Sequence, residues 1–108
     1  MGINEQAYEC VEGLVRIRQN EIVYLESDGH RITIHTTGGD YHIYRRLGEF
    51  EDDLSESGFL RIHKSFLVNI SFVRQIRRYS MTLDNGIVLP VSKMKYMDIK
   101  KQIMHFAL

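Results

Sequence analysis

The sequence lacks the features of membrane, secreted and disordered proteins. None of its apolar runs approaches the roughly 20 residues that a membrane-spanning helix needs, and its start, MGINEQAYEC, has neither the basic nor the apolar region of a signal peptide. The single cysteine, Cys10, cannot form an intramolecular disulfide, which agrees with a reducing compartment. With one proline and no low-complexity tract, the 108 residues have the composition of one globular domain with one modest core, which we expect in the cytoplasm.

The sequence also lacks the motifs of enzymes, metal sites and nucleotide sites. Its five histidines form no HExxH, HxH or Cys/His zinc set, and no GxxxxGK or GxGxxG loop is present. Ser65 lies close to His63, but without the glycine elbow or partner carboxylate of a nucleophile. We therefore expect no enzymatic activity, no metal and no cofactor, and we expect Cys10 to be a small buried or half-buried thiol.

An excess charge of either sign is missing overall, but the charge is divided unevenly along the chain. Residues 1–58 carry five Lys/Arg against twelve Asp/Glu, a balance of −7, and residues 59–108 carry nine against two, a balance of +7. A basic half suits a polyanion such as a nucleic acid. The alternative is that the two halves attract each other, so that most of the charge is internal or solvated.

Alternating apolar residues predict strands in the first half of the chain. The pattern runs through residues 13–25, with a plausible turn at Gln19 and Asn20, and then through residues 31–36 and 41–44. The polar turns 27–30 and 37–40 separate these segments. Short strands joined by glycine-bearing turns are typical of an antiparallel meander.

A change of period then predicts a short amphipathic helix. Leu47, Phe50 and Leu54 lie at helical spacing with acidic residues between them, and Gly58 stands where a glycine could end the helix. We expect the acidic face of this helix to be solvated and to point away from any nucleic acid.

The segment FLRIHKSFLVNISF (59–72) is apolar but carries polar residues in its middle. A dry core strand would not hold His63, Lys64, Ser65 and Asn69 within seven residues. The pattern therefore predicts two strands with a turn between them.

The next segment predicts a hairpin and a terminal helix. FVRQIRRYSMTL (72–83) forms one expected strand and IVLPV (87–91) the other, joined by an Asn85-Gly86 turn of type I′ with positive φ at both positions. Pro90 has no backbone donor, so we expect it at a sheet edge or strand end. Beyond it, Ser92 can cap a helix with an apolar stripe formed by Tyr96, Ile99, Ile103 and Phe106.

Three turns or element ends combine cationic and hydrogen-bonding side chains: DGHR (28–31), HKS (63–65) and VSKMK (91–95). Loops held rigidly by sheets and bearing Arg, Lys and His are suited to the grooves of DNA. Backbone N–H groups near Ser92, at the start of the last helix, would form a natural phosphate site.

Three segments together closely resemble the LytTR family of DNA-binding domains, the output modules of many bacterial response regulators. They are EIVYLESDGHRITIHT (21–36), FLRIHKSFLVNISFVRQI (59–76) and LDNGIVLPVSKMK (83–95), and the resemblance runs from about Tyr8 to the end. It implies a mainly β, elongated fold of several small antiparallel sheets with one or two short helices. We accordingly assign residues 8–108 to a LytTR-type domain and residues 1–7 to a linker or an added remnant.

The resemblance also implies which residues touch DNA. The three positions that contact bases in the family match His30, Lys64 and Lys93, one in each loop. Our candidates for phosphate contacts are Arg31, Ser65, Ser92, Lys95, Arg74, Arg77 and Arg78. We expect His63 and Asn69 to brace the loop rather than touch bases. The family often has Arg or Asn in place of Lys64, and Arg in place of Lys93; because lysine has no planar fork, a phosphate role stays open for both.

The implied function is specific binding of double-stranded DNA by a transcription regulator of a two-component system. Loops would enter two successive major grooves, and two copies would occupy repeated half-sites. Either a receiver or sensor domain would precede this chain, or the chain would be a stand-alone regulator. The alternatives are a protein-interaction or sensory module that uses the basic C-terminal half, and a binder of RNA or single strands, for which exposed stacking aromatics are not evident in the sequence.

Overall fold

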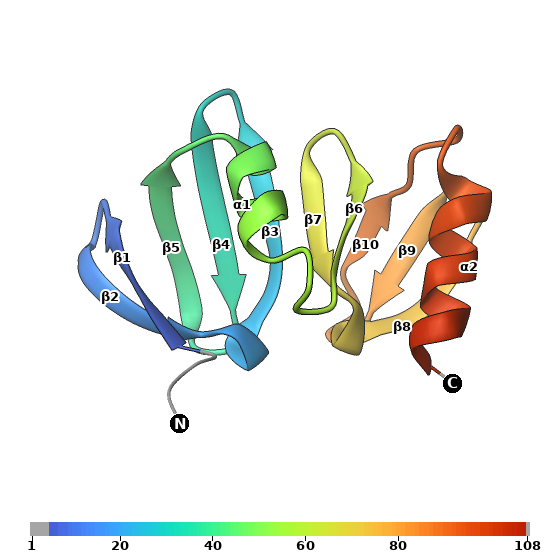
Figure 1. The fold of residues 1–108 in the computed structure, drawn as a ribbon, viewed down its shortest axis with the longest axis horizontal. Coiled ribbons are helices and arrows are strands. Elements are labelled where there is room, and N and C mark those ends of the chain that lie inside the picture. Colours follow the sequence, from blue (N-terminus) through green and yellow to red (C-terminus); the bar gives the residue numbers. More distant parts are fainter. Residues whose placement is uncertain (1–4, 108) are drawn as a thin grey trace.

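The structure, a computed structural model, describes residues 5–107. The chain alternates short strands with tight turns, and two α-helices and two single-turn 3-10 helices interrupt them (Figure 1). In chain order the elements are β1 (Glu5–Cys10), β2 (Gly13–Arg18), η2 (Gln19–Glu21), β3 (Ile22–Asp28), β4 (Arg31–Thr36), β5 (Gly39–Tyr44), α1 (Leu47–Asp53), β6 (Phe59–His63), β7 (Phe66–Asn69), η3 (Ile70–Phe72), β8 (Val73–Arg77), β9 (Ser80–Leu83), β10 (Val88–Pro90) and α2 (Tyr96–Ala107).

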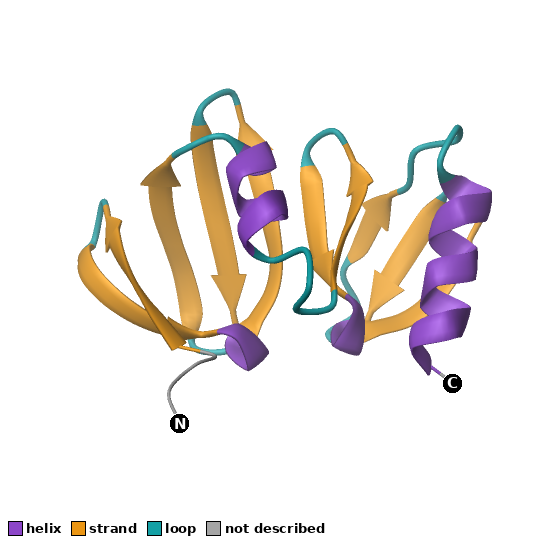
Figure 2. Cartoon of the chain, viewed as in Figure 1, coloured by secondary structure: helices purple, strands orange, loops and turns teal. Residues whose placement is uncertain are grey.

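The strands form three antiparallel sheets side by side. A five-stranded sheet of order β5-β4-β3-β7-β6 occupies the centre, the β1–β2 hairpin lies at one end, and a three-stranded sheet of order β10-β9-β8 lies at the other (Figure 2). The helix α1 lies in front of the central sheet, and α2 lies over the three-stranded one (Figure 1). This arrangement confirms the predicted mainly β fold of several small antiparallel sheets with two short helices.

Two hydrophobic clusters, rather than the single core expected, lie on opposite faces of the central sheet. Leu25 and Ile34 join the cluster under α1 and the β1–β2 hairpin, which includes Phe50 with 1% of its surface exposed. Tyr24 and Val68 join the cluster beneath the three-stranded sheet and α2. Because β3 is covered on both faces, four consecutive residues, 22–25, are buried, as in strands of doubly covered sheets.

The expected strand 72–83 is two strands, because a turn at residues 78–79 separates β8 from β9. The predicted hairpin between β9 and β10 is confirmed, but its turn is not type I′. Among the described residues only glycines have positive φ, so Asn85 does not, whereas Gly86 has a φ of +87°. The Gly86 amide donates to the Leu83 carbonyl at 2.9 Å, which gives a three-residue loop ending in a left-handed glycine. Pro90 lies in β10, an edge strand, as expected.

Both helices form where predicted, with different ends. The stripe of α1 is buried at Leu47, Phe50 and Leu54, but the helix ends at Asp53, and Gly58 lies beyond it at the start of β6. The helix α2 begins at Tyr96, after a turn at residues 93–95, so Ser92 does not directly precede it.

The apolar stripe of α2 is complete over its first part only. Ile99 is buried and Ile103 half-buried, but Phe106 is 53% exposed. No helix of the described residues is long and apolar enough to cross a membrane.

The N-terminal boundary differs from the expected one. Residues 5–7, assigned to a linker, belong to β1 and pair with residues 16–18 of β2. The remainder of that segment, residues 1–4, lies outside the described residues.

Candidate nucleic-acid interface

Three loops from distant parts of the sequence lie along one edge of the molecule, at the top of Figure 1. They are the β3–β4 turn (29–30), the β6–β7 turn (64–65) and the loop between β10 and α2 (91–95). We call these three segments the loop edge. They contain or adjoin the three predicted groups of cationic and hydrogen-bonding residues.

Backbone hydrogen bonds join the neighbouring strands at this edge. The amide of Ser27, near the end of β3, donates to the Ser65 carbonyl at 2.9 Å. The amide of Ser92 donates to the Ile62 carbonyl of β6 at 2.8 Å. The β6–β7 hairpin is therefore tied to β3 on one side and to the loop before α2 on the other, so the strands hold the three segments in fixed relative positions.

The β3–β4 turn presents His30 and Arg31. Asp28 and Arg31 face each other across the ladder, so only Gly29 and His30 make the turn, and Gly29 supplies the positive φ of +64° that it needs. His30 and Arg31 are both exposed. The His30 carbonyl accepts the Arg45 amide at 2.9 Å, which fixes this turn to the chain entering α1.

The β6–β7 turn presents Lys64, which is exposed, and Ser65, which is half-buried. His63 Nδ1 accepts the Ser65 amide at 3.1 Å, so the predicted bracing role of His63 is confirmed. Asn69 does not brace this loop, because it lies at the other end of β7, where its Nδ2 donates to the Ile22 carbonyl at 2.9 Å.

The loop between β10 and α2 presents Lys93 and Lys95, both exposed. Lys93 Nζ lies 5.5 Å from the centroid of the Tyr79 ring, within the range of a cation–π contact. The Ser92 amide already donates to β6, so the expected phosphate site cannot use that group. Lys95 lines a cleft of about 320 Å³ between the two helices, together with Glu51 and Asp98.

The three arginine candidates in β8 and in the turn that follows it do not all lie at the end of the strand nearest the loop edge. Arg77 pairs with Ser80 at the end of β8 nearest the loop edge, since the Val91 amide donates to the Tyr79 carbonyl at 3.0 Å. Arg78 lies in the same turn. Arg74 lies toward the opposite end, where its Nε is 3.5 Å from Asp84 Oδ1.

The salt bridges show which basic side chains are already paired with a carboxylate and which are available to a ligand. Within residues 5–107, the exposed candidates at or beside the loop edge take part in none. By contrast, Arg45 is bound to Glu49 and Asp53 and lies over the Phe50 ring. Among the predicted candidates, the available cations at or beside the loop edge are Arg31, Lys64, Lys93, Lys95, Arg77 and Arg78.

Sequence reasoning missed two arginines beside the loop edge. Arg46 is exposed, follows the residue that binds the His30 carbonyl, and has no salt bridge within the described residues. Arg61 donates to the carbonyls of His63 and Lys64. The only sequence signal was the Arg-Arg pair between β5 and α1; nothing in the sequence distinguished Arg61 from an ordinary outward-facing strand residue.

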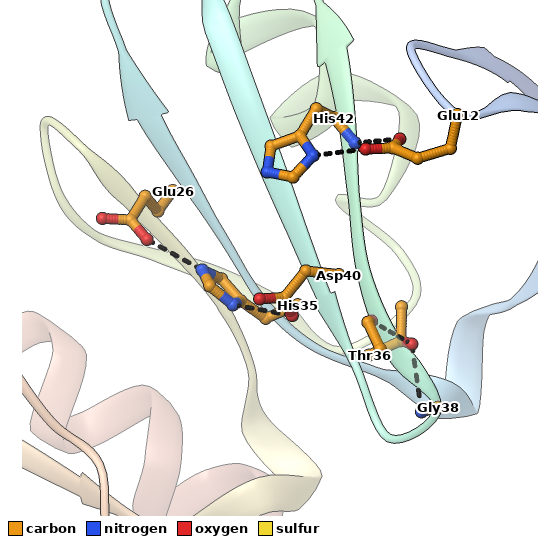
Figure 3. Close-up of polar contacts among 8 residues, drawn as sticks. Glu12, Glu26, His35, Thr36, Gly38, Asp40 and His42 are labelled. Carbon is orange, nitrogen blue, oxygen red and sulfur yellow. Dashed lines mark hydrogen bonds and ion pairs between the residues drawn. The ribbon is translucent and has the colours of Figure 1, made fainter.

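The other two strand histidines pair with carboxylates on the outer surface of the central sheet (Figure 3). His35 lies between Glu26, at 2.7 Å, and Asp40, at 3.0 Å. Beside the next strand, Glu12 accepts from His42 Nδ1 at 2.6 Å and from the His42 amide at 2.9 Å, and these bonds hold the pKa of Glu12 below its ordinary value.

The β4–β5 turn is closed by Thr36 Oγ1, which accepts the Gly38 amide and donates to the Gly39 carbonyl (Figure 3).

The Cys10 thiol is half-buried. Its burial, and to a smaller extent the neighbouring carboxylates of Glu12 and Glu9, raise its pKa, so this cysteine is a poor nucleophile.

Comparisons with known proteins agree with this geometry. Residues 12–104 match the family model of the LytTr DNA-binding domain. The sensory transduction protein LytT of Bacillus subtilis is 26% identical over 105 residues, which cover 93% of this chain and 44% of that protein. The transcriptional regulatory protein LytR of Staphylococcus aureus (strain N315) is 27% identical over 92 residues, which cover 81% of this chain and 37% of that protein.

A solved structure shares the fold. A LytTr DNA-binding domain from Bacillus cereus superposes with a TM-score of 0.77 at 23% sequence identity, covering 95% of this chain and 98% of that one. The chain spans less than half the length of LytT and LytR.

Proposed function

Because this chain belongs to the family of LytTr DNA-binding domains, we propose that it binds specific sequences of double-stranded DNA as the output domain of a bacterial transcription regulator. One relative, LytR, is named a transcriptional regulatory protein, which supports the regulatory role. The proposal involves binding alone, without a catalysed reaction or a cofactor.

The observation that carries the proposal is the loop edge itself. Segments as far apart in sequence as the β3–β4 turn and the loop before α2 lie along one side (Figure 1), and backbone hydrogen bonds of Ser65 and Ser92 tie two of them to the neighbouring strands β3 and β6. Rigidly held loops with unpaired cations suit the recognition of a DNA surface, whose grooves are lined by phosphates.

We assign base contacts to His30, Lys64 and Lys93, one from each loop. All three side chains are exposed, and His30 and Lys64 lie at the tips of two-residue turns. Lysine donates to the O6 and N7 acceptors of guanine in the major groove, although without the bidentate geometry of arginine.

We assign phosphate contacts to the side chains around these readers. Arg31, Ser65, Lys95, Arg77 and Arg78 lie at or beside the loop edge, and Arg46 joins them because it is exposed next to the β3–β4 turn. Two earlier candidates are weaker: Ser92, because its amide is already bonded, and Arg74, because it faces Asp84 near the far end of β8.

The size of the molecule suits two successive major grooves. Its longest extent is 38 Å, and one turn of B-DNA spans about 34–36 Å. If the long axis follows the duplex, the molecule lies over about one turn of DNA, which is the spacing of two successive major grooves. A second copy on a repeated half-site would then double the footprint.

The full regulator is proposed to be longer than this chain. The relatives LytT and LytR are more than twice as long as the region they share with it, which leaves room for a further domain, and we propose that this is a receiver or sensor domain preceding it. We take the DNA-binding domain itself to begin at β1, since residues 5–7 complete the β1–β2 hairpin.

A binding competition tests this function. A fluorescent duplex, enriched from a random library by the chain itself, would be displaced by unlabelled duplex, single-stranded DNA or RNA over a series of salt concentrations. We expect the enriched duplex to compete best at every salt concentration. Equal competition by all three, or enrichment of no sequence, would refute specific DNA recognition, and selective binding of an acidic protein instead would support the protein-interaction alternative.

A further inference from the structure

Arg61 binds both carbonyl groups that frame the tip of the β6–β7 turn. Its Nε donates to the His63 carbonyl at 2.9 Å, and Nη2, on the same edge of the guanidinium, donates to the Lys64 carbonyl. In an extended strand, consecutive carbonyls point in opposite directions. Here both converge on one cation, so Arg61 holds the backbone of Lys64 in the bent conformation of the turn.

A β-bulge lies at the same place. The register of β6 against β7 shifts between Arg61 and His63, so that His63 rather than Ile62 faces Phe66. Bulges redirect the side chains that follow them. The bulge and the Arg61 contacts therefore act on the same short segment, the one that presents Lys64.

The remaining nitrogen of Arg61 is anchored by α1. Nη1 donates to Glu51 Oε1 at 2.9 Å, and the Arg61 side chain is 21% exposed against 43% for Glu51. The acidic face of α1 was expected to be solvated, and Glu51 remains 43% exposed but also pairs with Arg61. Two nitrogens of the Arg61 guanidinium are bonded to backbone carbonyls, and the third pairs with the Glu51 carboxylate. Arg61 is therefore poorly placed to contact a phosphate.

We infer that Arg61 is a positioning residue for DNA recognition: held by Glu51, it fixes the β6–β7 turn so that Lys64 points at one base step. This inference rests on the proposed DNA-binding function. It assigns to α1 a role in specificity, although α1 itself touches no DNA.

The variants separate positioning from charge. Lysine in R61K keeps the positive charge but cannot hold two carbonyls and a carboxylate in a planar fork. E51A removes the anchor. D52A is the matched control, because it removes the same charge from the neighbouring exposed residue of α1, and Asp52 forms no salt bridge within residues 5–107. E51Q keeps an acceptor for Nη1 and should lie between wild type and E51A.

The first measurement is the ratio of affinities for the enriched duplex and a scrambled duplex of the same length. We expect the ratio to fall about tenfold in R61K and about threefold in E51A, the sizes typical of lost charged hydrogen bonds and of a lost half-exposed ion pair. In D52A the ratio should not change. If E51A and D52A alter both affinities by equal factors, Glu51 is only a surface charge and the inference is wrong.

The second measurement needs no DNA. In 15N NMR spectra, the Ser65 amide, which donates to His63, should shift and exchange faster with solvent in R61K and E51A, while the amides of Gly29 and His30 stay as in the wild type. An unchanged Ser65 amide in both variants would overturn the positioning role. If the wild type enriches no duplex, the proposed function fails, and this measurement still decides whether Arg61 holds the turn.

Discussion

The cations left unpaired at the loop edge set the expected salt dependence of DNA binding. Each neutralised phosphate contributes about −0.9 to the slope of log affinity against log salt concentration. Seven cations at or beside the loop edge have no salt bridge within residues 5–107, namely Arg31, Arg46, Lys64, Arg77, Arg78, Lys93 and Lys95. If all seven contact phosphate, the slope is about −6.3, and affinity falls about 6,000-fold between 50 and 200 mM salt.

The salt dependence also distinguishes a base contact from a phosphate contact for Lys64 and Lys93. If Lys64 and Lys93 contact bases rather than phosphates, five phosphate contacts remain, and the slope is about −4.5. The assay is fluorescence anisotropy with the enriched duplex and a scrambled duplex at several salt concentrations. A slope near −6.3 for both duplexes would assign both lysines to phosphates.

A matched pair of variants tests the footprint. Lys95→Ala should weaken binding to all sequences alike and make the slope shallower by about 0.9, as for the loss of one phosphate contact. Arg74→Ala should leave the slope unchanged, because its Nε lies 3.5 Å from Asp84 near the far end of β8. Both side chains are exposed, so folding stability should stay within about 0.5 kcal/mol. Equal changes of slope in the two variants would refute the loop edge as the DNA-binding surface.

Three further predictions concern recognition, packing and pH. His30→Ala should relax preference at one base position in a library selection while nonspecific affinity stays nearly intact; an equal loss on all sequences would remove it as a reader. Phe50→Ala should lower the free energy of unfolding by about 3–5 kcal/mol in denaturant titrations, against less than about 0.5 for Leu14→Ala, because Phe50 is 1% exposed and Leu14 68%. Bonds from His42 lower the pKa of Glu12 in the folded state from its ordinary 4.5, so its contribution is present above about pH 4.5 and lost as the pH falls through the folded value. Glu12→Gln should therefore flatten the acid limb of the thermal unfolding profile, and an unchanged limb would contradict the pairing.

Strands and turns could be predicted wherever neighbouring residues specify them. In β4, Ile32 and Ile34 face the core while Arg31 and His35 point outward, as period-two alternation requires. Gly29 marked the β3–β4 turn because a left-handed conformation there favours glycine. Such signals depend on one or two residues and their immediate neighbours, so they can be read without knowing the fold.

Predictions from the sequence failed where a turn carried no turn-forming residue, or where packing against another element outweighed the local sequence pattern. The turn at Arg78 and Tyr79 has no glycine, proline or asparagine, so the alternation seemed to continue through it. The expected cap at Ser92 was wrong, because three residues separate Ser92 from Tyr96, the first residue of α2. The Ser92 amide instead donates to the Ile62 carbonyl of β6. The position of Ile62 relative to residue 92 follows from packing and from no local signal.

The order of polar and apolar residues by itself determined the mainly β fold, the two short helices and the three cation-bearing loops, because alternation, turn residues and charge are local properties. Only the tertiary structure decided which cations are available to DNA. Arg61 and Arg74 look like Lys64 and Arg77 in the sequence, yet the first two face carboxylates of Glu51 and Asp84 at 2.9 and 3.5 Å. Ion pairing depends on distances through space between side chains of different elements, and packing of those elements sets these distances.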